Sequence, residues 1–146
     1  LLHEILKTER TRPKLTPPSL ADATAHLGEF WLQTGRPVDA ETVLRESLAL
    51  RIKHQPRDWQ RFSAESLLGG ALLAQKKPLE AGPLLRSGYD GLQKLSQTIP
   101  GEERHHMRDA IERMAQFVET TEGTAAAEAW KRKLMEFDQA DHLAGR

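Results

Sequence analysis

The sequence contains no cysteine, only 5% aromatic residues, and no excess of charge of either sign. The lack of cysteine excludes disulfides and thiolate metal sites, and it predicts a reducing, cytoplasmic setting. The 21 basic and 21 acidic residues cancel, so there is no electrostatic reason to expect a nucleic acid partner. The longest nearly apolar run, residues 67–74, is far too short to span a bilayer, which predicts no membrane insertion.

The sequence does contain helix-capping residues, glycines and prolines at regular intervals. No stretch shows sustained period-two alternation, so helices are expected and strands are not. Ser19 followed by Asp22 resembles a capping box and predicts the start of the first helix. Gly35 predicts the end of that helix in a left-handed cap, and Pro37 predicts the start of the next. The expected helices span residues 19–34, 37–54, 58–75, 78–96, 102–122 and 124–142.

The chain also repeats itself. A shift of 41 residues matches eight positions that are mostly small, turn-forming or core-facing: Ala23/Ala64, Leu27/Leu68, Gly28/Gly69, Leu32/Leu73, Pro37/Pro78, Ala40/Ala81, Leu44/Leu85 and Arg45/Arg86. A weaker third copy places Ala115 and Ala127 at the positions of Gly28 and Ala40. Self-similarity at this period is typical of a helical repeat array.

The recurring residues have a physical role in helix packing. Glycine or alanine at 28, 69 and 115, with alanine at 40, 81 and 127, removes bulk where two helices cross. Large residues such as Trp31, Leu44, Leu72 and Leu85 are expected to fill the space that remains. A single pair cannot bury its apolar face alone. The sequence therefore predicts an all-α fold, an α-solenoid of antiparallel helix pairs.

The pattern Leu27-Gly28-x-x-Trp31, followed by Ala40-x-x-x-Leu44, resembles the tetratricopeptide repeat. The usual unit has about 34 residues; the longer period here resembles the repeats of kinesin light chains, although their paired asparagines are missing from "TAHLGEF" and "AESLLGG". Residues 58–93 further resemble the carboxyl-terminal repeats of certain bacterial serine/threonine protein kinases, and no kinase motif occurs in the chain. The resemblance implies a right-handed superhelix that serves as a non-catalytic accessory region.

This resemblance also divides the chain. Residues 19–54 form the first expected repeat, 58–96 the second, and 102–143 a degenerate third repeat that acts as a carboxyl-terminal cap. Residues 1–10 are expected to be the end of a preceding repeat's second helix, so that the chain belongs to a longer array.

A concave groove lined by the first helix of each repeat is the binding site that the resemblance implies. Its expected lining is Asp22, Glu29, Leu32, Gln33, Ser63, Ser66, Gly70, Leu73, Glu112 and Gln116. The lysine and asparagine clamp with which chaperone-binding members hold a terminal carboxylate is absent. The groove is therefore expected to bind a neutral or basic peptide segment.

Two histidine clusters allow a metal site to be considered. His26 and Glu29 are three residues apart on one helix, and His105 and His106 lie close to Asp109. A metal site needs three or four converging ligands, and neither HExxH nor paired ExxH motifs occur. We therefore predict no metal, no cofactor and no catalytic residue.

Three functions follow in order of preference. The first is a scaffold that binds a protein or peptide, as part of a larger signalling protein such as a kinase. The second is a structural cap or self-association module of a longer array, and the third is an enzyme with a helical metal site.

Overall fold

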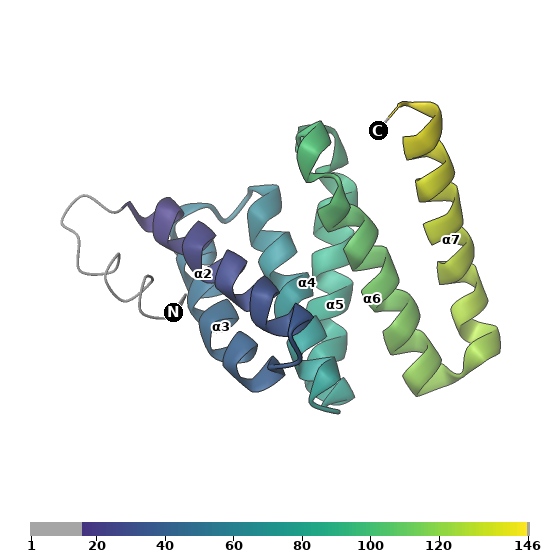
Figure 1. The fold of residues 1–146 in the computed structure, drawn as a ribbon, viewed down its shortest axis with the longest axis horizontal. Coiled ribbons are helices and arrows are strands. Elements are labelled where there is room, and N and C mark those ends of the chain that lie inside the picture. Colours follow the sequence, from purple (N-terminus) through teal and green to yellow (C-terminus); the bar gives the residue numbers. More distant parts are fainter. Residues whose placement is uncertain (1–15, 146) are drawn as a thin grey trace.

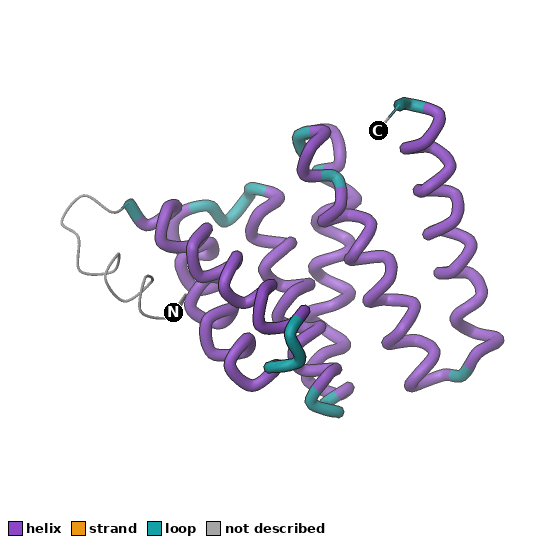
Figure 2. Tube along the Cα trace, in the orientation of Figure 1, coloured by secondary structure: helices purple, strands orange, loops and turns teal. Residues whose placement is uncertain are grey.

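A computed structural model describes residues 16–145, and every regular element in that range is helical (Figure 1). Figure 2 shows these helices joined by short loops, with no strand among the described residues. The predicted all-α class is therefore confirmed, whereas the expectation for residues 1–10 lies outside the described range. The helices are α2 (Pro17–Gln33), α3 (Pro37–His54), α4 (Trp59–Ala74), α5 (Pro78–Lys94), α6 (His105–Glu122) and α7 (Thr124–Leu143), and two 3-10 turns, η1 (Ser96–Thr98) and η2 (Gly101–Glu103), separate α5 from α6.

The first helix begins earlier than its sequence pattern predicts. Thr16 is the N-cap, and its hydroxyl oxygen accepts a hydrogen bond from the Ser19 backbone N–H at 3.2 Å. Pro17 opens α2, because a proline at the first helical position lacks only a donor that would have no helical partner. The predicted capping box is wrong: Ser19 and Asp22 both lie inside α2, and Asp22 pairs with Arg51 instead.

The turns within the helix pairs follow the repeat. Gly35 has a φ of +77°, as its predicted left-handed cap requires, and Pro37 opens α3. In the second copy Lys76 takes the place of Gly35 with a φ of +62°, two residues before Pro78 opens α5. The same backbone turn is therefore built twice, once with glycine and once with a residue that must tolerate positive φ.

Helices that are neighbours in the chain are neighbours in space (Figure 1). The most extensive contacts lie within the pairs α2–α3, α4–α5 and α6–α7, followed by those between α3 and α4 and between α5 and α6. The first helices of the pairs also touch, α2 against α4 and α4 against α6. None of the described helices is long and apolar enough to cross a membrane.

Within the first two pairs, a glycine faces a leucine at the same repeat position. A Cβ atom on Gly28 would lie 2.5 Å from Leu44 Cγ, and one on Gly69 would lie 2.7 Å from Leu85 Cγ. Both leucines are fully buried, so neither can withdraw into solvent. These contacts confirm that the recurring small residues allow the helices of a pair to cross closely.

The backbones of α4 and α5 also approach each other closely at a second place, which the repeat pattern does not predict. A Cβ atom on Gly88 would lie 2.8 Å from both the Phe62 carbonyl oxygen and the Ser66 amide nitrogen. One on Gly91 would lie 2.1 Å from the Phe62 ring. The backbones of α4 and α5 are therefore in direct contact, which only glycine permits.

Candidate binding groove

Two adjoining pockets lie between α2, α4 and α6. The first, which we call the Trp59 pocket, has a volume of about 320 Å³ and is also reached by α3 and η2. The second, the Gln33 pocket, has a volume of about 290 Å³ and lies between α2 and α6. Glu29 lines both pockets, so we describe them together as the groove.

His106 occupies one side of the Trp59 pocket and is held from three directions. Its Nδ1 lies 3.0 Å from the Ser63 hydroxyl, and its Nε2 lies 3.0 Å from a Glu103 carboxylate oxygen. The Trp59 ring packs against the imidazole, with centroids 5.2 Å apart. The ring is thereby fixed between α4 and η2.

Arg51 reaches the same pocket from α3. Its side chain is almost fully buried and donates a hydrogen bond to Asp22 at 2.5 Å and another to Gln55. Its buried Nε has no hydrogen-bond partner among the described residues, and the same is true of the buried Gln60 Oε1. The pocket wall therefore carries one donor and one acceptor whose bonding capacity is unused within this part of the chain.

Arg113 crosses α4 at the boundary of the Gln33 pocket. Its guanidinium donates to the Ser66 hydroxyl at 3.1 Å, and a Cβ atom on Gly70 would lie 3.0 Å from its Nε. Burial lowers the pKa of Arg113 from its ordinary value, while nearby carboxylates, including Asp109, act to raise it. The room that Gly70 leaves is thus taken by Arg113.

The structure brings most of the predicted groove residues together. Asp22, Glu29 and Ser63 line the Trp59 pocket, and Leu32, Gln33, Glu112 and Gln116 line the Gln33 pocket with Glu29. Three others lie elsewhere, because Ser66 and Gly70 are under the Arg113 side chain and Leu73 packs against the main hydrophobic core.

Several lining residues were not predicted. Glu102 and Glu103 belong to the turn before α6, and Arg51 belongs to the second helix of its pair, so all three lie outside the first helices from which the predicted lining comes. Arg113 stands three positions before the predicted Gln116, and this spacing places both residues on the same side of a helix.

The groove is acidic although the whole chain is neutral. Six carboxylate side chains line the two pockets, against two guanidinium groups: Asp22, Glu29, Glu102, Glu103, Asp109 and Glu112, against Arg51 and Arg113. Both arginines already donate to groups of the protein. Arg108, which lies outside the two pockets, pairs with Glu112. The excess of carboxylates gives the groove a negative potential, which attracts cationic side chains.

His106 is expected to make folding stability depend on pH. Burial, and then the charge of His105, lower the pKa of His106 below its ordinary value of 6.5, against the opposing effect of Glu29 and Glu103. The unfolded chain therefore takes up a proton at a higher pH than the folded chain. The free energy of unfolding falls as the pH drops below 6.5, by at most about 1.4 kcal/mol per pH unit from this group.

Urea unfolding of the wild type and of His106→Gln on either side of pH 6.5 measures this effect. The variant should show the shallower pH dependence, and the carboxylates that both proteins share cancel in the comparison. Parallel pH profiles would contradict the prediction.

Comparisons with known proteins do not extend this description. No protein-family profile matches the chain, and no curated protein sequence matches it.

Proposed function

We propose that the chain is a non-catalytic protein-interaction module of the tetratricopeptide type, whose groove binds a basic segment of a partner protein. The observation that carries this proposal is an acidic groove lined mainly by the first helices of three successive helix pairs. The Gly28–Leu44 and Gly69–Leu85 contacts, at equivalent positions, support two stacked copies of one unit. In this proposal the pairs form a right-handed α-solenoid with α2, α4 and α6 on its concave face.

The groove offers specific partners for a lysine or arginine side chain. Glu102 is exposed at the rim of the Trp59 pocket, and the buried Gln60 Oε1 can accept a hydrogen bond from an incoming ammonium or guanidinium group. The Trp59 ring can cover the aliphatic part of such a side chain. In the Gln33 pocket, Asp109 attracts a second cation beside Glu112, which already pairs with Arg108. Recognition thus combines carboxylate pairing with burial of the side-chain stem.

In this proposal the module holds a partner protein and catalyses no reaction. The resemblance to the repeats of bacterial serine/threonine kinases supports a place beside a catalytic domain in a signalling protein of the cytoplasm. In such a protein the groove would bring a basic substrate or regulator close to that domain.

A peptide array with the full chain tests this function. Peptides of equal length carry lysine and arginine, only neutral residues, or aspartate and glutamate at the same positions. Basic peptides should bind best. Added salt should weaken the binding of these peptides, because salt screens exposed charges. The double variant Glu102→Lys and Asp109→Lys, with one change in each pocket, should bind them at least about tenfold more weakly, a loss of about 1.4 kcal/mol.

The matched control reverses two exposed charges on α7, Glu128→Lys and Glu136→Lys, and changes the net charge equally. Circular dichroism establishes that both variants fold. Binding without charge preference, or an equal loss in the α7 variant, would contradict a groove-specific interaction.

A specific observation favours the second candidate function, self-association or capping. The last helix, α7, has Ala127 as its one buried residue, and it exposes 62% of Met135 and 87% of Leu143. Exposed apolar side chains on this helix can pack against a second copy or a further pair. Light scattering over a range of concentrations separates this function from peptide binding, since self-association needs no ligand.

A further inference from the structure

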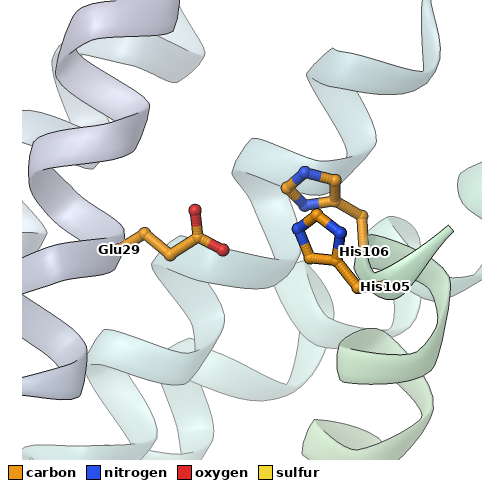
Figure 3. Close-up of side chains that lie close together, drawn as sticks. All are labelled: Glu29, His105 and His106. Atoms are coloured by element: carbon orange, nitrogen blue, oxygen red, sulfur yellow. The ribbon is translucent and has the colours of Figure 1, made fainter. Parts of the chain in front are cut away.

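Three metal-ligand side chains converge at the centre of the groove. Glu29 comes from α2, and His105 and His106 come from the first turn of α6. One donor atom from each lies within 4.8 Å of the other two, and the two imidazole rings are 4.1 Å apart between centroids. Figure 3 shows the Glu29 carboxylate directed toward the two rings. We propose that these residues bind one divalent ion of the zinc class, which joins the first helix pair to the third.

The donor set suits such an ion. Two imidazoles and one carboxylate are the ligands of many three-residue zinc sites, which keep a fourth position for water or another ligand. Ligand atoms in a tetrahedral zinc site lie roughly 3.4 Å apart, so the three groups must move inward by a small distance. His105 is exposed and Glu29 is only partly buried, so both side chains can rotate without disturbing the core.

The surroundings of His106 provide the outer support that a ligating imidazole needs. If Nε2 binds the ion, Nδ1 keeps its contact with the Ser63 hydroxyl; if Nδ1 binds it, Nε2 keeps its contact with Glu103. Such contacts fix ring orientation in metal sites.

The charges around the cluster favour a cation. Glu29 faces the histidines from α2, and Glu103 faces them from η2. The Asp109 and Glu112 carboxylates line the adjoining Gln33 pocket. A bound ion would partly neutralise these groups, and it would link α2 to α6 across α4. Because it binds the folded chain, the ion should raise the unfolding temperature, and above the Kd this rise should grow with the logarithm of the ion concentration.

Calorimetric titration of the untagged, chelator-treated chain with zinc chloride tests the proposal. One ion should bind per chain, and Glu29→Gln and His105→Asn should each weaken binding at least about tenfold. Cobalt(II) should give the strong visible absorption of a four-coordinate site in the wild type, and this signal should be lost in both variants. Neither change touches the buried core, and circular dichroism checks that both variants fold.

His142→Asn, which removes an exposed imidazole from α7, is the matched control and should leave zinc affinity unchanged. The proposal is overturned if the wild type does not bind zinc at millimolar concentration. It is also overturned if affinity survives in both groove variants, or falls equally in the control. Because this titration contains no peptide, its outcome is independent of the proposed peptide binding.

Discussion

Replacing Gly88 by alanine is expected to lower the free energy of unfolding by a net amount of about 2 kcal/mol, because overpacking a well-filled core costs up to about 3 kcal/mol. The new Cβ atom would lie 2.8 Å from the Phe62 carbonyl oxygen and from the Ser66 amide nitrogen. Both are backbone atoms of a buried stretch of α4, so α4 and α5 must move apart as whole helices. Removing a glycine from a helix restores only about 1 kcal/mol. Urea unfolding followed by circular dichroism measures the difference.

Gly101→Ala is the matched control for this measurement. Nothing lies within 4 Å of a Cβ atom at Gly101, and its backbone does not need positive φ. The control should therefore stay within about 0.5 kcal/mol of the wild type, as surface substitutions usually do. If Gly88→Ala is equally harmless, then α4 and α5 do not cross as closely as described.

Removing the Leu44 side chain is expected to have an effect at least as large. Leu44 is fully buried between α2 and α3, and a leucine-to-alanine change at such a site costs about 2 to 5 kcal/mol. Gly28→Ala alone should also be destabilising, because the added Cβ would lie 2.5 Å from Leu44 Cγ. In the Leu44→Ala background, however, the same change fills part of the cavity and gains helix propensity. The double variant should therefore be more stable than Leu44→Ala alone.

A double-mutant cycle measures this reversal of sign. The corresponding cycle at Gly69 and Leu85 should show a weaker rescue, because a Cβ on Gly69 also lies 3.1 Å from the Leu85 backbone nitrogen. Simply additive costs at Gly28 and Leu44 would contradict the proposed glycine–leucine fit.

Much of the fold could be predicted because the residues that pack one helix against another recur in both copies. Gly28 and Gly69 recur, and so do the leucines that they face, so the pattern pointed to a close helix crossing. Gly88 could not be predicted in this way, because the equivalent position in the first copy is Ser47. There the Ser47 hydroxyl donates to the Ala21 carbonyl oxygen at 2.8 Å. The same close approach of two helices is thus made by a glycine in one copy and by a hydrogen-bonding serine in the other. Because the two residues differ, comparing the copies does not reveal the approach.

The candidate site was predictable only in part. Glu29 and Gln33 follow from helical period within one repeat, and both line the Gln33 pocket. The meeting of Glu29 with His105 and His106 joins two different repeats, and its geometry depends on how three helix pairs stack. No spacing within the sequence encodes that distance. The Arg113 side chain that covers Ser66 and Gly70 escaped prediction for the same reason.

The contacts of Gly28 with Leu44 and of Gly69 with Leu85 each lie inside one helix pair. A gene segment that encodes one pair therefore carries its internal fit with it when it is duplicated. Only the outward surfaces must then adapt to the new neighbour. Proteins built from this unit can lengthen or shorten by whole pairs during evolution, whereas the gain or loss of a single helix would separate a glycine from its leucine.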